Sequence, residues 1–557
     1  MNGPTRVRPF VSSAQAGKAR RGPFRSICRL SCALILLLVS GWTSSLFAAD
    51  GKVVYDKYCT QCHGDQGDGR GYAADFVIPK PRDFTTGVFK FRSTGSEYLP
   101  TREDLVRVVR DGIPGTSMPA FSHIGQAEID AVVDYLPSFY QDRLERDKED
   151  GFWPPKVIEM GAPPKVTDAL IAEGMQVYLS SGCGDCHGHD GRADGPSAPG
   201  LEDDLGDPIK AANLAQSWRF RSGNSLSDIY KAFTTGISGT PMASFADSLK
   251  PDQRWALAAY VQSLSTLAEP EPSSILIAGR VEGDLPESLD DPRWADAQTA
   301  YFPLTAQVMW EPININPTVL GVHVRGLHND SELTLLLEWD DPSYSLATEE
   351  EEESEEDDFF DDEEETVVAL DDGFAIQFPA GEVQSNQRPY FVMGESASPA
   401  NLWRWRNHDG IARSDEKSPR EGDWQNYFVA YEGSPLLANQ LAKGREQTSE
   451  ITESGLSGTI RYRNGTYTLL ISRDLKTTSG DVMLDVGTFI PIAFWAWDGH
   501  NEEEGAKGSL SAWYYLQLEE PPDSSVYLKS AGAALLLVVL QFMAMISARK
   551  KHRGGLS

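Results

Sequence analysis

The segment Cys59-Thr60-Gln61-Cys62-His63 decides the fold of the first part of the chain, and it returns as Cys183-Gly184-Asp185-Cys186-His187. In this CxxCH pattern each thiol can form a thioether to a haem vinyl group, and the adjacent histidine lies beneath the iron as its proximal ligand. A zinc site or a redox dithiol is the alternative, but zinc would need further Cys or His partners that the chain lacks. The pattern therefore predicts two haems c. The residues expected to bind them covalently are Cys59, Cys62, Cys183 and Cys186.

Each motif is followed by a glycine-rich segment that carries one methionine, Met118 in the first copy and Met242 in the second. The interval from the motif histidine to this methionine is 55 positions in both copies. A single methionine is more simply explained as a core residue, but equal spacing in two copies favours an iron ligand. We therefore expect His63 and Met118 to ligate one haem iron, and His187 and Met242 to ligate the other.

The offset of 124 positions between the motifs defines an internal repeat of one haem-binding unit. Cytochrome c domain 1 is predicted at 50–141 and cytochrome c domain 2 at 167–268. The proline pairs in 142–166 predict an extended linker. In each unit, short helices surround a loop-borne methionine, an arrangement that resembles an all-α class I cytochrome c.

Two sequence signals mark the middle helix of each unit. Thr101 stands three residues before Asp104, and Ser225 stands three residues before Asp228, which is the spacing of a helix N-cap and its partner. The last helix of the second unit is predicted at 251–264, with proline at its first position.

Composition limits the redox centres and the partners. The chain has 557 residues, enough for three or four domains, and its formal net charge of −32 makes nucleic acid an unsuitable partner and a basic protein a suitable one. Of six cysteines, four belong to the haem motifs, while Cys28 and Cys32 lie near the N-terminus. None remains for an iron–sulfur cluster. An iron–sulfur or molybdenum centre would have to belong to another subunit.

The N-terminal segment 1–49 reads as a signal peptide, with a basic region, an apolar run and small residues before a cleavage position. Export to the periplasm fits covalent haem attachment. An uncleaved anchor helix is the alternative, although the apolar run is short for a membrane span.

Beyond residue 275 the pattern changes from helical to alternating. Apolar residues alternate along 333–339 and 374–378, and Asn464-Gly465 divides two strand-like runs as a hairpin turn. The region 275–520 is therefore predicted as an all-β, sandwich-like domain. Residues 349–365 interrupt it with fourteen acidic residues, which predicts either a disordered, solvated insertion or a docking element for a basic redox partner.

The C-terminal part predicts a membrane anchor. Residues 530–548 carry no charge and would form a helix about 28 Å long, close to the hydrocarbon core of a bilayer. The tail 549–557 is basic, which predicts that it lies in the cytoplasm and that the haem domains lie in the periplasm. The span contains no histidine, so it is expected to be an anchor without a haem of its own.

Several aromatic motifs of the β region together resemble one family. It is the haem b-binding γ subunit of type II DMSO-reductase-like molybdoenzymes, found in ethylbenzene dehydrogenase, dimethyl sulfide dehydrogenase, selenate and chlorate reductases and nitrite oxidoreductase. The motifs are Arg293-Trp294, Phe391-Val392-Met393-Gly394-Glu395, Asn401-Leu402-Trp403-Arg404-Trp405, Phe494-Trp495-Ala496-Trp497-Asp498-Gly499 and Trp513-Tyr514.

The resemblance implies one non-covalent haem b, ligated by a methionine and a lysine. By motif, these ligands are Met393 and Lys507. A lysine ligates iron only as the neutral amine, against an intrinsic pKa of about 10.4. From the residues alone, Lys507 resembles a surface lysine in a charged loop, and Met309 and Met483 are alternatives to Met393.

The expected function is that of a membrane-anchored periplasmic electron-transfer subunit with two haems c and one haem b. The resemblance implies that it passes electrons between a molybdenum and iron–sulfur oxidoreductase, preferably of the nitrite oxidoreductase type, and a soluble or membrane carrier. The chain is not expected to be catalytic alone.

Three alternatives are open from the sequence. One is a γ subunit of a selenate or chlorate reductase or of a hydrocarbon dehydrogenase. Another is a dihaem peroxidase-like enzyme, which would need one haem with an open position. The third is an adhesive or ligand-binding sandwich with accessory cytochromes, which would bind no haem b.

Overall fold

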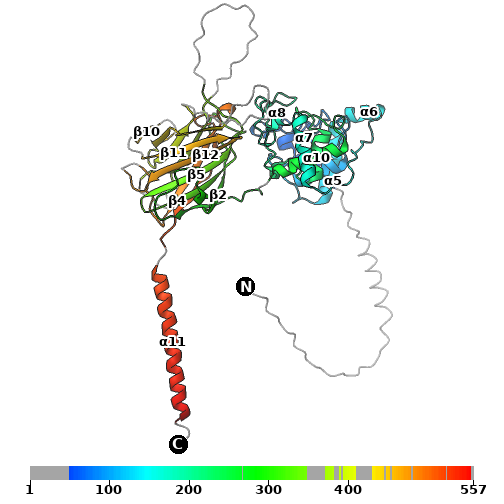
Figure 1. Ribbon diagram of the computed structural model, residues 1–557. Helices are drawn as coiled ribbons and strands as arrows, with labels where there is room; N and C mark the ends of the chain where they lie inside the picture. Colours follow the sequence, from blue (N-terminus) through cyan, green and yellow to red (C-terminus); the bar gives the residue numbers. More distant parts are fainter. Residues whose placement is uncertain are drawn as a thin grey trace, which may run out of the picture. The chain divides into compact units, whose positions relative to one another are not determined.

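Helices come first along the chain, strands follow, and the long helix α11 comes last (Figure 1). This order confirms the predicted sequence of two helical domains, one β domain and one apolar C-terminal helix. Residues 1–48, the acidic insertion 349–365 and the pair Phe391-Val392 lie outside the described residues. The computed structural model describes residues 49–265, 268–347, 370–381, 388–390, 393–408, 430–444, 447–451, 455–477, 481–521 and 524–553.

The first helical domain consists of short helices separated by loops. They are α2 Gly51–Tyr58, α3 Thr60–His63, η1 Ala74–Phe76, α4 Arg102–Asp111, α5 Gln126–Tyr135, η2 Leu136–Phe139 and α6 Gln141–Glu149. The helix α4 begins as predicted, because Thr101 Oγ1 accepts a hydrogen bond from Asp104 N (3.2 Å) and Asp104 Oδ2 accepts one from Thr101 N (3.1 Å). This capping box satisfies amides that the helix itself leaves without partners.

The helix α6 occupies the beginning of the segment predicted as a linker. Leu144 is its only aliphatic residue, so no apolar periodicity marks the helix in the sequence. Arg143 Nε and Asp147 Oδ1 form an ion pair of 2.6 Å one turn apart, and Asp147 is buried. The first helical domain therefore extends to Glu149.

The second helical domain repeats the first. Its helices are α7 Asp168–Ser180, α8 Gly184–His187, η3 Ser217–Arg219, α9 Leu226–Thr235 and α10 Pro251–Leu264. Ser225 caps α9 by accepting a hydrogen bond from Asp228 N (3.1 Å), and α10 begins at its proline as predicted.

A glycine lets two helices of each domain approach closely. A Cβ placed on Gly51 of α2 would lie 2.1 Å from Ala131 O of α5. A Cβ on Gly174 of α7 would lie 2.0 Å from Ala256 O of α10. Only glycine fits such a backbone contact. The two domains thus share the same helix crossing.

The β domain contains fifteen strands among the described residues; twelve form one hydrogen-bonded path, and β2, β3 and β14 pair beside it. The strands are β1 Ile275–Arg280, β2 Thr299–Pro303, β3 Thr305–Ala306, β4 Gly321–His328, β5 Glu332–Asp340, β6 Gly373–Pro379, β7 Ala400–Arg406, β8 Ala430–Gly433, β9 Leu437–Ala442, β10 Thr448–Glu450, β11 Ser457–Arg463, β12 Thr466–Asp474, β13 Phe489–Trp497, β14 Ser509–Leu510 and β15 Tyr514–Leu518.

The strand β13 joins two sheet layers. Its residues 489–492 pair with β15, and its residues 493–497 pair with β6. One layer follows the order β15-β1-β4-β5-β12-β11-β8, and the other follows β10-β9-β7-β6-β13. The turn between β11 and β12 has positive φ at Asn464 (49°) and Gly465 (66°), as a two-residue hairpin turn requires. The predicted hairpin is confirmed.

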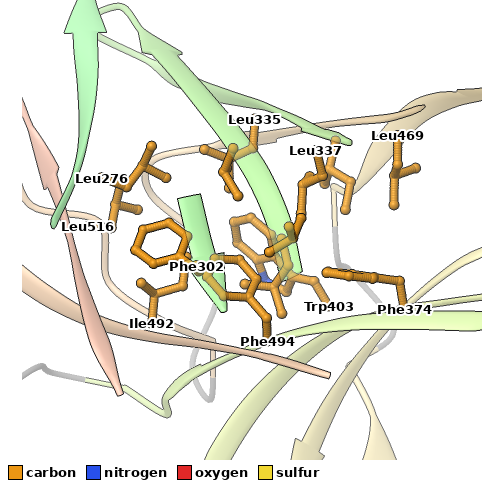
Figure 2. Packing of buried hydrophobic residues seen from close by; sticks show 14 of the residues in the cluster. Leu276, Phe302, Leu335, Leu337, Phe374, Trp403, Leu469, Ile492, Phe494 and Leu516 are labelled. Atoms are coloured by element: carbon orange, nitrogen blue, oxygen red, sulfur yellow. The ribbon is translucent and has the colours of Figure 1, made fainter. Parts of the chain in front are cut away.

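The main core lies between the two layers (Figure 2). It is lined by Leu335, Leu337 and Leu469 from one layer and by Phe374, Trp403 and Phe494 from the other. The predicted alternation of β5 is confirmed, because Leu333, Leu335, Leu337 and Trp339 all belong to this core. Burial of two apolar sheet faces against each other is the dominant stabilising contribution in such a sandwich.

The last helix, α11 Ser524–Arg553, is uninterrupted (Figure 1). Its segment Lys529–Ser547 is long and apolar enough to cross a membrane, with a mean hydropathy of 2.0 and no residue buried against the rest of the protein. It is therefore a candidate transmembrane helix.

Candidate haem sites

The four motif cysteines carry free thiols and are partly buried. Cys59 and Cys183 directly precede the short helices α3 and α8, which carry Cys62 and Cys186 together with the motif histidines. Among the described residues, the only group of three or more Cys, His, Asp and Glu side chains with ligand atoms close enough to share a metal ion lies in the β domain and contains no residue of either motif. This arrangement disfavours the zinc alternative, which requires four converging ligands.

Both motif histidines are held by a backbone carbonyl. His63 Nδ1 donates to Arg82 O (3.0 Å), and His187 Nδ1 donates to Ala212 O (2.9 Å). A carbonyl oxygen only accepts, so Nδ1 carries the ring proton and Nε2 keeps a lone pair for a metal. Burial lowers the pKa of both histidines, which keeps the rings neutral. The ring of His63 also stacks on Phe84, with centroids 4.5 Å apart.

The methionine loops have the same internal hydrogen bonds in the two domains. Met118 N donates to Thr116 Oγ1 (3.2 Å), and that hydroxyl donates to Ile113 O (2.8 Å). Met242 N donates to Thr240 Oγ1 (3.2 Å), whose hydroxyl donates to Ile237 O (2.7 Å). The sequence spacing is therefore matched by equal loop geometry.

In the second domain, the motif and the methionine loop meet at one apolar core. Cys183 and Met242 both pack against the cluster that contains Tyr178, Tyr230 and Trp255. An apolar core beside the motif suits a buried porphyrin ring. Free thiols, a histidine Nε2 with a lone pair and a methionine loop are the donor set that a haem c requires.

In the β domain, one face of the β6, β7, β9 and β13 layer points away from the main core. Small side chains of Ala375, Ala400 and Ala442 lie on it beside Trp495 and Trp497. Alternation along β13 explains this second face, because Phe494 and Ala496 point into the main core while the two tryptophans point outward.

Met393 lies on this outer face and is 7% exposed. Its φ of 55° is unusual for a side-chain-bearing residue, and the conformation is held from both sides. Met393 N donates to Gln377 Oε1 of β6 (3.0 Å), and Met393 O accepts from Gly444 N (3.0 Å). The alternatives Met309 and Met483 are 54% and 48% exposed, so the structure favours Met393 over both as a buried ligand.

The loop that carries Lys507 reaches the same outer face through Trp497. Trp497 Nε1 donates to Gly505 O (3.0 Å), and a Cβ on Gly508 would lie 2.7 Å from that nitrogen. The Lys507 side chain is 26% exposed, and its Nζ lies 3.3 Å from Glu502 Oε2. The methionine and the lysine named by the resemblance thus come from two segments that contact one tryptophan cluster.

A buried carboxylate organises the lysine loop. Glu503 is 1% exposed, and its Oε1 accepts from Asn314 Nδ2 (3.0 Å) and Asn501 Nδ2 (2.7 Å). Its Oε2 accepts from Asp498 N (3.1 Å). Burial raises the pKa of the Glu503 carboxyl. The acidic run 502–504 therefore contains one structural carboxylate in addition to surface ones.

Three buried polar atoms that have no hydrogen-bond partner among the described residues test whether a haem b fits this face. They are Arg404 Nε, Gln440 Oε1 and Trp495 Nε1. Residues paired directly across neighbouring strands lie on the same face of a sheet, and Ala375 and Leu402 belong to the outer face. Trp495 and Arg404 both pair with Ala375, and Gln440 pairs with Leu402, so all three lie on the outer face. Buried polar groups are rarely left without partners, so these atoms fit a bound group with polar substituents on an apolar ring.

Sequence reasoning did not single out Gln377, Gln440 or Trp495 as site residues. Gln377 and Gln440 lie in strands whose alternation alone gives no sign of a site. Trp495 lies in the motif 494–499. The signal that could have identified it is a large aromatic residue on the face of the strand opposite the core.

Three protein-family models match the chain in succession. Residues 47–136 match the model described as cytochrome c oxidase, cbb3-type, subunit III. Residues 171–265 match the cytochrome c model, and residues 291–509 match the model described as ethylbenzene dehydrogenase. The last match includes both Met393 and Lys507.

Relatives with assigned roles match parts of the chain. A candidate respiratory nitrate reductase haem subunit of Haloferax mediterranei is 25% identical over 30% of this chain and 52% of its own length. The chlorate reductase γ subunit of Ideonella dechloratans is 29% identical over 26% of this chain and 50% of its own length. The chain thus spans about half the length of these curated relatives.

A solved structure also matches a part of the chain. A chain of the Kuenenia stuttgartiensis reducing HAO-like protein complex is 42% identical, with a TM-score of 0.36, and the match covers 38% of this chain and 94% of that chain.

Proposed function

We infer that the protein is an electron-transfer subunit that links a molybdenum and iron–sulfur oxidoreductase to another electron carrier. The inference rests on two cytochrome c matches followed by a match to the ethylbenzene dehydrogenase model. The described relatives are subunits of a nitrate and a chlorate reductase, so an enzyme acting on a small oxyanion is the proposed partner. The nitrite oxidoreductase type is the preferred parent. The chain itself would catalyse no substrate reaction.

Each cytochrome c domain would hold one haem c. The motif thiols would fix the porphyrin covalently, and Nε2 of His63 or His187 would ligate the iron from one side. Met118 and Met242 would ligate it from the other side, positioned by the threonine-braced loops. The bound haem supplies a one-electron redox centre. Thioether ligation raises its potential, which favours a subunit that delivers electrons outward from the partner enzyme.

The β domain would hold one haem b on its outer face. Met393 and Lys507 would be the two iron ligands, and Trp495 and Trp497 would cover apolar ring surface. The guanidinium of Arg404, whose Nε has no partner in the described part of the chain, would meet a carboxylate substituent of the haem. Burial lowers the pKa of Arg404, and a carboxylate neighbour would offset that desolvation.

The helix α11 would anchor the protein in the bacterial inner membrane. Basic residues near the end of the chain would remain in the cytoplasm, so the three haems would lie in the periplasm. In this position the haems would connect a periplasmic enzyme with a periplasmic or membrane carrier.

The observation that carries the proposal is that two domains share the same histidine contacts and methionine-loop bonds and precede a β domain with an apolar, tryptophan-lined outer face. The test is a pyridine haemochrome assay on the purified full chain, before and after acid–acetone extraction. We expect two haems c that stay with the protein and one haem b that is extracted. No extractable haem b would overturn the assignment of the β domain, and a five-coordinate, high-spin haem c in the resting protein would indicate a peroxidase-like enzyme instead.

A further inference from the structure

Three aspartates from distant parts of the β domain meet at one buried point. Asp341 directly follows β5, Asp372 directly precedes β6, and Asp498 directly follows β13. Each offers a carboxylate oxygen, and these oxygens lie within 4.8 Å of one another. The three residues are only 0%, 1% and 2% exposed. The cluster therefore joins strand ends of both sheet layers and lies beside the start of the loop that leads to Lys507.

Neutral donors satisfy most of the carboxylate oxygens. Asp372 Oδ2 accepts from Tyr467 OH (2.6 Å) and Ser345 N (2.6 Å), and Asp372 Oδ1 accepts from Gly499 N (2.9 Å). Asp498 Oδ1 accepts from the hydroxyl of Ser343 (2.9 Å).

One fully buried oxygen of the cluster has no partner among the described residues. Asp341 Oδ1 accepts from Ser343 N (3.1 Å), but Asp341 Oδ2 is fully buried and accepts no hydrogen bond from the described residues. A buried carboxylate oxygen without a donor is costly, because water that would solvate it has been removed. This oxygen is an independent sign that something else occupies the space in front of it.

Among the described residues, no positive side chain forms an ion pair with the three aspartates, although the buried Lys210 lies close enough to attract Asp498 and Asp341. Arg406 and His408 contact Asp371, the residue before Asp372, at 3.4 and 3.3 Å. Lys210 Nζ donates to Asn316 O (3.3 Å) and to Thr318 Oγ1 (2.6 Å). Burial and the neighbouring carboxylates raise the pKa of Asp341 and Asp372 well above the usual range.

We propose that Asp341, Asp372 and Asp498 bind one calcium ion. This ion would fix the start of the loop that carries Lys507. Calcium takes oxygen ligands at about 2.3–2.6 Å, so two ligands on opposite sides of one ion are up to about 5 Å apart. The spacing of the three oxygens fits this limit. Magnesium is less suitable, because it keeps several waters and the cluster is buried among side chains.

The calcium ion would connect the two sheet layers to the lysine loop. Asp498 is followed by the turn η6 Gly499–Asn501, and Asp498 N donates to Glu503, the buried carboxylate of the loop. A cation on Asp498 would therefore hold the turn from which Lys507 extends. This consequence rests on the proposed haem b site, whereas the calcium site itself does not.

The experiment uses the full chain in detergent, treated with EDTA and then dialysed against calcium, with metal content measured by mass spectrometry and stability by thermal unfolding. We expect one tightly held calcium per chain and a higher unfolding midpoint with calcium. In Asp341→Asn, that calcium and the shift in midpoint should both be lost. Asp485→Asn changes an exposed aspartate of the same domain and should behave as the wild type.

The direction in which Asp341→Asn shifts the unfolding midpoint separates a cluster that binds calcium from a cluster that holds no cation. If the aspartates hold no cation, Asp341→Asn removes like-charge repulsion between buried carboxylates and should raise the unfolding midpoint. That result, or a wild type that binds no calcium and does not respond to it, would overturn the proposal. If Asp341→Asn does not fold, the EDTA and calcium titration of the wild type still decides the question. Haem content is measured in parallel, so a missing calcium site with two haems c and one haem b would leave the proposed function intact.

Discussion

Met118 and Met242 occupy the same position in two equal loops, so one substitution should have the same effect in both domains. Met118→His or Met242→His should keep the haem covalently attached and lower the midpoint potential of that site, because imidazole replaces a thioether. Spectroelectrochemical titration measures each midpoint. Met309→His changes an exposed methionine and should leave all midpoints unchanged. Unchanged midpoints in both loop variants would remove these methionines from the ligand list.

Lys507 is the residue whose proposed role depends most on resemblance. Its side chain is partly exposed and lies beside Glu502, as a surface lysine would. A surface lysine contributes within about 0.5 kcal/mol to stability and nothing to haem content. As an iron ligand, it should be required for haem b retention.

We therefore expect Lys507→Ala to reduce extractable haem b and to shift its optical spectrum, with both haems c unchanged. Lys476→Ala removes an exposed lysine of the same domain and is the matched control. Equal haem b content and spectrum in the two variants would contradict the assignment. Met393→Ala should reproduce the loss, whereas Met483→Ala, at an exposed position, should not.

At the scale of elements, the methionine loops are held by a hydroxyl that both accepts and donates. Thr116→Val leaves Met118 N and Ile113 O without this partner, a cost of about 1 kcal/mol to the loop. We expect more rapid loss of methionine ligation on mild heating, measured as the fraction of low-spin haem c. Thr116→Ser keeps the hydroxyl and should behave as the wild type. If the valine and serine variants behave alike, the hydroxyl does not brace the ligand.

Elements with a local chemical signal were predictable from sequence. Thr101 and Ser225 have side chains that cap a helix within three residues, and Asn464-Gly465 allows the positive φ that a hairpin turn needs. The helix α6 was missed because its residues are nearly all charged. The role of the outer face of β7 and β9 was missed for another reason. The side of a strand that binds a cofactor depends on pairing between segments that are distant in the sequence.

In the candidate sites too, residues with a local sequence signal were predictable, and residues brought together by distant pairing were not. The haem c motifs are contiguous and repeat, so residues and spacing were sufficient to propose their ligands. Met393 and Lys507 are 114 positions apart in the sequence, and only the family resemblance connected them. Gln377 holds Met393 across the sheet, a contact that no local pattern reveals.

At the scale of the whole molecule, charge is the property that bears on partners. The net charge is −32, and residues 349–365 contribute fourteen of the 82 acidic side chains within seventeen positions. Such a concentration of one sign raises the rate at which an oppositely charged protein is captured, provided that salt does not screen it. The range of the effect is about 30 Å at 0.01 M salt and about 8 Å at 0.15 M.

If this acidic segment attracts a basic redox partner, replacing its Asp and Glu residues by Asn and Gln should slow association mainly at low ionic strength. The substitution keeps the length of the segment, so it separates charge from chain length. The measurement is stopped-flow electron transfer to a basic soluble cytochrome c as salt is varied, with an acidic cytochrome as control. We expect the rate for the basic partner to fall several-fold at low salt and to converge with the wild type at high salt, because only long-range attraction has been removed. Dissociation and the haem midpoints should stay the same, since no haem ligand is changed. Equal association rates at low salt would show that the segment is a solvated insertion, and the approach of a partner would then depend on the charge of the folded domains alone.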